Sequence, residues 1–112
     1  MTTQTAAADG VVSLGDDDIG SVVGTESTVL VEFYTEWCGS CQRMEPLLER
    51  IAADTDVTVL TVDIESHLET AIAYGAQSAP TFVLFVDGAP VKQLRGAQDE
   101  QALRALVARF DE

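Results

Sequence analysis

The chain has 112 residues and carries 19 acidic side chains against six Lys and Arg, which gives a formal net charge of −13. This charge argues against nucleic acid and anionic membrane surfaces as main partners, because both bind clustered Lys and Arg. The hydrophobic content of 46% excludes an acidic disordered chain, and the length suits one domain.

The first half of the chain predicts a tail, two strands and two helices. Residues 1–10 are rich in Thr and Ala and predict a flexible tail, which leaves residues 11–112 as a single domain. A short strand and a short helix are expected over 11–23. The run TVLVEFY at 28–34 is typical of a strand buried on both faces. Apolar residues at helical spacing then predict an amphipathic helix that ends near Thr55.

The next segment predicts a strand followed by a short helix. Residues 57–64 form a second run typical of a buried strand. Ser66 and Glu69 have the spacing of a capping box, which predicts a helix over 67–74 that Gly75 closes.

The last third predicts a hairpin and a final helix. Residues 81–86 and 91–95 read as two strands joined by a turn at Asp87 and Gly88, and a helix is expected to begin near Asp99. Strand–helix–strand crossovers followed by a hairpin predict an α/β domain with a mixed sheet and helices on both faces.

A C-x-x-C motif, Cys38-Gly39-Ser40-Cys41, lies where a buried strand meets a helix. The N-terminal end of a helix stabilises a thiolate, and a second sulfur three residues later can close a bridge, so the position predicts dithiol–disulfide exchange. A partial metal site and two inert thiols are the alternatives. A structural zinc site needs four ligands, whereas the chain offers two Cys and one His, so no metal is expected.

The segment 31–41, VEFYTEWCGSC, resembles the thioredoxin pattern V-D-F-W-A-x-W-C-G-P-C, and Ala79-Pro80-Thr81 resembles the cis-proline loop of that family. The resemblance implies a thioredoxin fold, a three-layer αβα sandwich around a mixed sheet of four to five strands. It also implies a monomeric protein-disulfide reductase that needs no cofactor beyond its own Cys38–Cys41 disulfide. The implied partners are oxidised proteins and a thioredoxin reductase, either NADPH- or ferredoxin-linked.

The resemblance also assigns roles to individual positions. Cys38 matches the exposed nucleophile and Cys41 the buried resolving thiol. A substrate-binding surface is expected at Trp37, Gly39, Ser40, Ala79, Pro80, Gly96 and Ala97.

Glu32 is the one ionisable residue inside the buried run 28–34. Burial of a carboxyl raises its pKa, which suits a proton acceptor for Cys41 near neutral pH. The family has Asp at this position. The alternative is that Glu32 points to an edge of the sheet and stays solvated.

Two departures from the family pattern bear on function. Ser40 replaces a proline, and a hydroxyl that bonds the Cys38 thiolate would make the couple more oxidising. This keeps open an oxidase or isomerase-like carrier, and a thioredoxin-fold binding or chaperone module is the other alternative. Thr61 stands where the family often has a Lys beside the buried acid.

The chain contains one Lys, Lys92, and its acidity resembles that of proteins from salt-accumulating halophiles. Residues 1–10 lack the basic and apolar regions of a signal peptide, so a cytoplasmic location is expected.

Overall fold

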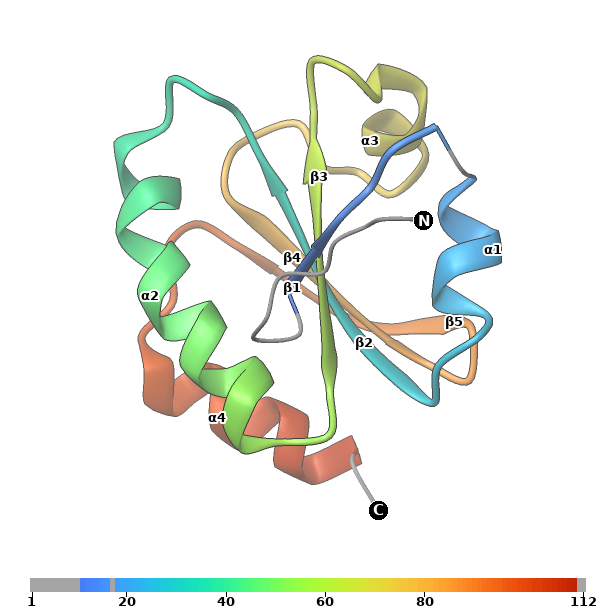
Figure 1. The fold of residues 1–112 in the computed structure, drawn as a ribbon. Coiled ribbons are helices and arrows are strands. Elements are labelled where there is room, and N and C mark those ends of the chain that lie inside the picture. The colour runs from blue at the N-terminus through green and yellow to red at the C-terminus, as the bar shows by residue number, and fades with distance from the viewer. Residues whose placement is uncertain (1–10, 17, 111–112) are drawn as a thin grey trace.

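A computed structural model describes residues 11–16 and 18–110, so the predicted tail over 1–10 lies outside the described residues. Five strands form one sheet in the order β1-β3-β2-β4-β5, with helices on both of its faces (Figure 1). The elements in chain order are β1(Val11–Ser13), α1(Ile19–Val23), β2(Thr28–Tyr34), α2(Gly39–Asp54), β3(Thr58–Asp63), α3(Leu68–Ala73), β4(Thr81–Val86), β5(Ala89–Arg95) and α4(Glu100–Phe110). This confirms the predicted order and the three-layer αβα arrangement.

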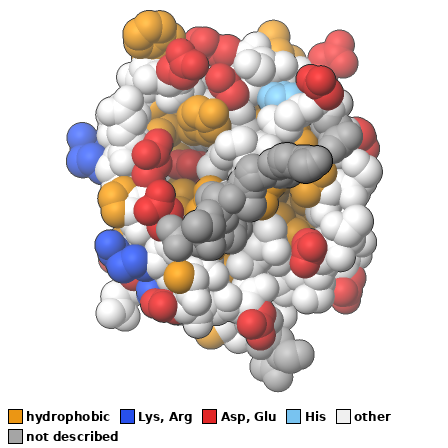
Figure 2. All heavy atoms as spheres, in the orientation of Figure 1, with side chains coloured by type: hydrophobic (Ala, Val, Ile, Leu, Met, Phe, Trp, Pro, Cys, Tyr) orange, Lys and Arg blue, Asp and Glu red, His pale blue; other side chains and the backbone are white. Residues whose placement is uncertain are grey.

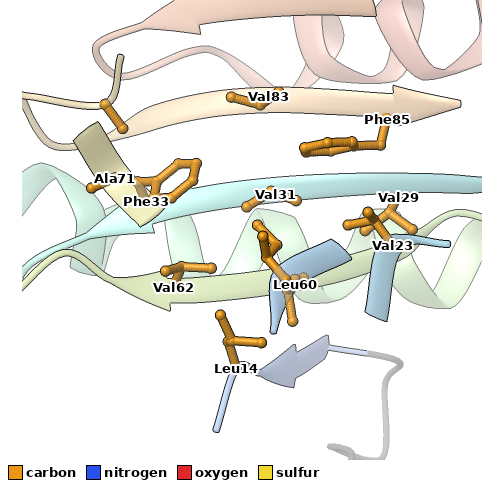
Figure 3. Packing of buried hydrophobic residues seen from close by; sticks show 12 residues of the cluster. Leu14, Val23, Val29, Val31, Phe33, Leu60, Val62, Ala71, Val83 and Phe85 are labelled. Atoms are coloured by element: carbon orange, nitrogen blue, oxygen red, sulfur yellow. The ribbon is translucent and has the colours of Figure 1, made fainter. Parts of the chain in front are cut away.

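Strand β2 lies at the centre of the mixed sheet, parallel to β3 and antiparallel to β4. Successive side chains of a strand point to opposite faces. Val29, Val31 and Phe33 therefore pack on the face covered by α1 and α3 (Figure 3). Leu30 packs on the other face, against α2 and α4. Glu32 shares the face of Leu30, and this alternation turns its carboxyl toward α2.

The β4–β5 hairpin turns at Asp87 and Gly88, as predicted, and both residues have positive φ, 53° and 84°. Strand β5 begins at Ala89, two residues earlier than expected, and contains Pro90. Proline is tolerated there because β5 is an edge strand with no further neighbour in the sheet.

The capping box predicted at the start of α3 is wrong. The residue before the helix is His67, and it makes no side-chain cap. Asp63, the last residue of β3, organises the turn instead: its carbonyl accepts the N–H groups of Ser66 and His67, and its carboxylate accepts the N–H of Glu65 at 2.9 Å. The N–H of Ser66 is therefore hydrogen-bonded to Asp63 instead of to a capping side chain, and the helix begins two residues after Ser66.

Helices α2 and α4 are joined by ion pairs on the surface of the same face. Arg50 pairs with Glu100 at 2.7 Å, and Arg104 pairs with Asp54 at 2.7 Å and with Glu100 at 2.8 Å. These pairs hold the pKa of Glu100 down, to about 2, mainly through the hydrogen bond from Arg50. Two of the six cations of the chain are therefore bound away from the cysteines.

Candidate active site

Cys38 and Cys41 form a disulfide at the N-terminal end of α2. Cys38 is the N-cap residue, and its sulfur accepts the N–H of Cys41 at 3.1 Å. The Ser40 hydroxyl lies 3.4 Å from the same sulfur. Cys38 is partly exposed and Cys41 is buried, so Cys38 is the more accessible of the two to a second protein. An N–H donor and the helix N-terminus both favour a thiolate there when the bond is reduced.

Glu32 is buried, with 2% of its surface exposed, so the solvated-edge alternative is wrong. Its pKa rises to about 7, first because burial removes water from the carboxylate and second because Glu45 is a like charge. Its Oε2 atom has no hydrogen-bond partner among the described residues. The predicted rise in the pKa of Glu32 is confirmed.

A cavity of about 240 Å³ lies between α2 and strands β1, β2 and β3, and both Glu32 and Cys41 line it. Figure 2 shows acidic side chains around a hollow on this face of the molecule. The described residues that line the cavity include four carboxylates and no Lys, Arg or His; the carboxylates belong to Glu32, Glu36, Glu45 and Glu49. The buried acid and the buried sulfur thus share one negatively charged space.

Thr61 lies beside Glu32 in the register of β2 and β3. Its hydroxyl is 3.2 Å from the hydroxyl of Ser13 and donates at 3.5 Å to the carbonyl of Val12. Where the family often has a Lys, this chain therefore has a neutral side chain whose bonds run to β1 rather than to Glu32.

The loop that carries Trp37 and the loop that carries Pro80 meet at one end of the sheet, because Phe33 pairs with Thr81. Trp37 has 81% of its surface exposed. The Ala79–Pro80 peptide bond is cis, as the resemblance implies. An exposed aromatic ring and the proline loop therefore lie at the same end as the cysteines.

The remaining residues of the expected binding surface lie in two different loops, one beside Pro80 and one beside the cysteines. Gly96 donates its N–H to the carbonyl of Pro80 at 2.8 Å, with φ of 86°, and exposed Ala97 follows it. Gly39 is exposed in the first turn of α2. The structure thus joins Gly96 to the proline loop, whereas Gly39 belongs to the cysteine loop.

Among the lining residues that sequence reasoning did not place in the site are Tyr34 and Glu49. Burial raises the pKa of the Tyr34 hydroxyl, and nearby carboxylates raise it further, beginning with Asp63. Glu49 could have been found, since Cys41, Glu45 and Glu49 follow at intervals of four and such residues share one face of a helix.

Within the described ranges, 11–16 and 18–110, no three His, Cys, Asp or Glu side chains are arranged to hold a metal ion. No described helix is long and apolar enough to cross a membrane.

Comparison with known proteins assigns the chain to a family. The sequence profile of the Thioredoxin family matches residues 10–109. A thioredoxin of Mycobacterium tuberculosis is 43% identical over 84 residues, which cover 73% of this chain and 72% of the relative. A thioredoxin of Alicyclobacillus acidocaldarius is 39% identical over 99 residues, which cover 87% and 94%.

A solved structure agrees with the sequence matches. A mutant thioredoxin from Halobacterium salinarum has a TM-score of 0.88 at 38% identity, with 97% of each chain covered. With the disulfide at the start of α2, these matches show that the chain belongs to the thioredoxin family and is a protein-disulfide oxidoreductase that works by thiol–disulfide exchange.

Proposed function

We propose that Cys38 is the nucleophile and Cys41 the resolving thiol of this reductase. The observation that carries the assignment is the disulfide at the start of α2, in which only Cys38 is partly exposed. The Cys38 thiolate attacks a substrate disulfide, forms a mixed disulfide and releases one substrate thiolate, which takes a proton from water. Cys41 then attacks the Cys38 sulfur and releases the second substrate thiolate. Two electrons pass to the substrate, and the Cys38–Cys41 disulfide forms.

Glu32 acts as the proton acceptor for Cys41 in the second step. The support is its burial, its pKa of about 7 and the cavity that it shares with Cys41. A base with a pKa near the working pH is available in its ionised form and still holds the proton that it takes.

Substrate proteins bind across the cysteine and proline loops. The proposed contact residues are Trp37, Gly39, Ser40, Ala79, Pro80, Gly96 and Ala97. Exposed Trp37 and the meeting of the two loops at one end of the sheet support this surface. A thioredoxin reductase, NADPH- or ferredoxin-linked, returns electrons to the disulfide, and the protein acts as a monomer whose domain spans residues 11–112.

Insulin reduction by dithiothreitol tests these roles. We expect Cys38→Ser to abolish the acceleration and Cys41→Ser to accumulate a mixed disulfide with the substrate. Absence of any acceleration by the native protein, with both thiols titratable, would instead favour a binding or chaperone module.

The role of Glu32 needs its own measurement, the pH dependence of substrate reduction. We expect Glu32→Gln to slow reduction by about 10²-fold or more near neutral pH and to remove the inflection near pH 7. An unchanged rate and profile would remove the proton-transfer role while leaving the cysteine assignments in place.

A more oxidising carrier is the second candidate, and the contact between the Ser40 hydroxyl and the Cys38 sulfur favours it. That hydroxyl stabilises a thiolate, which raises the reduction potential of the couple.

The proposed setting is the cytoplasm of a halophile. Support comes from the charge of −13, the single Lys and the likeness to a Halobacterium salinarum protein. Dithiol reductants work where a cellular reductant is supplied, which is the cytoplasm in most cells.

A further inference from the structure

The cavity beside Cys41 contains more acid than one proton acceptor requires. Cys41 and Glu45 are one turn apart on α2, on the same face of the helix, and both line the cavity opposite Glu32 of β2. Glu45 is exposed while Glu32 is buried. One carboxyl thus lies inside the cavity and another at its boundary with solvent.

The cavity offers these acids no counter-charge. The polar residues of α2 that line the cavity are Cys41, Gln42, Glu45 and Glu49. The other polar residues that line the cavity are Tyr34 of β2, Thr35 and Glu36 in the loop that follows β2, Thr61 of β3 and Ser13 of β1. Among the described residues, every charge that faces Glu32 across the cavity is therefore negative.

We infer that Glu45 is a positioning residue for disulfide exchange: its carboxylate acts across the shared cavity on Glu32, the acid that exchanges a proton with Cys41. This inference rests on the proposed role of Glu32. A carboxylate near a second carboxylate makes ionisation of the second less favourable. Glu45 therefore makes Glu32 a stronger proton acceptor at neutral pH than burial alone does, and it does so without touching the substrate.

The electrostatics of the site agree with this geometry. Besides the loss of water on burial, the negative charge of Glu45 raises the pKa of Glu32. Glu49 also lines the cavity and carries the same charge, but it lies one turn further from Cys41 along α2. The chain therefore contains a matched control for Glu45.

The first measurement is a carbon-13 NMR titration of the Glu32 carboxyl in the oxidised native protein and in the variants Glu45→Gln and Glu49→Gln. We expect Glu45→Gln to lower the pKa of Glu32 by roughly 0.5–1 unit and Glu49→Gln to lower it by less than half as much. Equal shifts in the two variants, or no shift in Glu45→Gln, would overturn the inference. The conservative variant Glu45→Asp should restore most of the native value.

The second measurement is the pH profile of substrate reduction by the same proteins. The inflection in the profile should move with the NMR titration in Glu45→Gln and stay close to its native position in Glu49→Gln. A titration that moves while the profile does not would overturn the positioning role.

The variant Glu32→Gln separates this inference from the proposed function. If Glu32→Gln removes the inflection but Glu45→Gln leaves it unmoved, the inference fails and the proposed function stands. If Glu32→Gln leaves the profile unchanged, the proposed role of Glu32 fails, and the inference fails with it.

Discussion

Ser40 distinguishes this cysteine loop from the family's C-G-P-C pattern. Its hydroxyl lies 3.4 Å from the Cys38 sulfur, close enough to donate a hydrogen bond once that sulfur is a thiolate. Proline at the same position would fix the backbone at the start of the helix and remove the hydroxyl. A serine here therefore changes both rigidity and thiolate stability.

We predict that Ser40→Pro lowers the reduction potential of the Cys38–Cys41 couple. A charge-assisted hydrogen bond contributes roughly 1.5–3 kcal/mol, which corresponds to about 30–60 mV for a two-electron couple. Equilibration with glutathione of known redox ratio measures the potential. Ser40→Ala is the control, since it removes the hydroxyl without adding a ring, and it should reproduce most of the shift. A potential that neither variant lowers would contradict the role of the hydroxyl.

Glu32 also makes stability depend on pH. Its pKa is about 7 in the folded chain against an ordinary value of 4.5, so the folded state holds more protons than the unfolded state between these two values. The free energy of unfolding contributed by Glu32 is therefore complete below pH 4.5 and is lost as the pH rises through 7.

We predict that Glu32→Gln removes this loss and is more stable than the native protein above pH 7, by about 3 kcal/mol, while the two converge below pH 4.5. Urea unfolding in molar KCl, where surface charges are screened, measures the difference. Glu49→Gln is the matched control because it removes one charge from the same cavity without removing the buried acid. Parallel pH profiles for the native protein and Glu32→Gln would show that burial does not perturb this carboxyl.

At the scale of the element, the Asp99 side chain caps the N-terminal end of helix α4. The carboxylate of Asp99 accepts the N–H of Ala102 at 2.7 Å, and the carbonyl of Asp99 accepts the N–H of Leu103. The N-terminal N–H groups of a helix have no partners within the helix, so this cap fixes where α4 begins.

We predict that Asp99→Ala lowers the free energy of unfolding by about 1 kcal/mol. Asp99→Asn keeps an acceptor oxygen at the same place and should lose less than half of that. Urea unfolding at constant salt compares the two. A loss of equal size in both variants would assign the effect to the charge rather than to the hydrogen bond.

Much of the fold was predictable because its signals are local. The apolar run of β2, the Asp87–Gly88 turn and the start of α4 near Asp99 each follow from a few adjacent residues. The start of α3 was not, because the carbonyl of Asp63 at the strand end binds the N–H of Ser66, which the capping box would have paired with the side chain of Glu69.

In the candidate site, too, some features could be predicted from the sequence and others could not. Burial of Glu32 could be predicted, since a polar residue inside a continuous apolar strand has no solvated face to occupy. The cavity could not, because it depends on how α2 lies against three strands that are far apart in the sequence. Helical spacing places Glu49 on the face of Cys41, but only that packing brings Glu49 and Tyr34 to the cavity that contains Glu32.

The whole molecule carries 19 acids and six Lys and Arg, and two of the Arg are bound in the α2–α4 ion pairs. Charge of this size opposes a compact state through self-repulsion, and molar salt shortens the Debye length to about 3 Å. The acids of the cavity add to this repulsion because they lie together with no Lys or Arg among the described residues that line it.

We predict that the melting temperature rises by about 10 °C or more from dilute buffer to molar KCl. Thermal unfolding followed by circular dichroism measures it, and a nonionic solute at equal osmolality is the control that separates screening from exclusion effects. A melting temperature that does not respond to KCl would contradict the proposed adaptation to high salt.

The two sulfurs of the disulfide face different surroundings, since Cys41 lines the cavity and Cys38 does not. A large protein bound over Cys38 can therefore leave the cavity in contact with water. In the proposed mechanism, electrons then cross the boundary of the molecule at Cys38, whereas the proton of Cys41 leaves through the cavity. If this mechanism holds, substrate proteins of very different shape can react with the same disulfide, because none of them has to provide an exit for that proton.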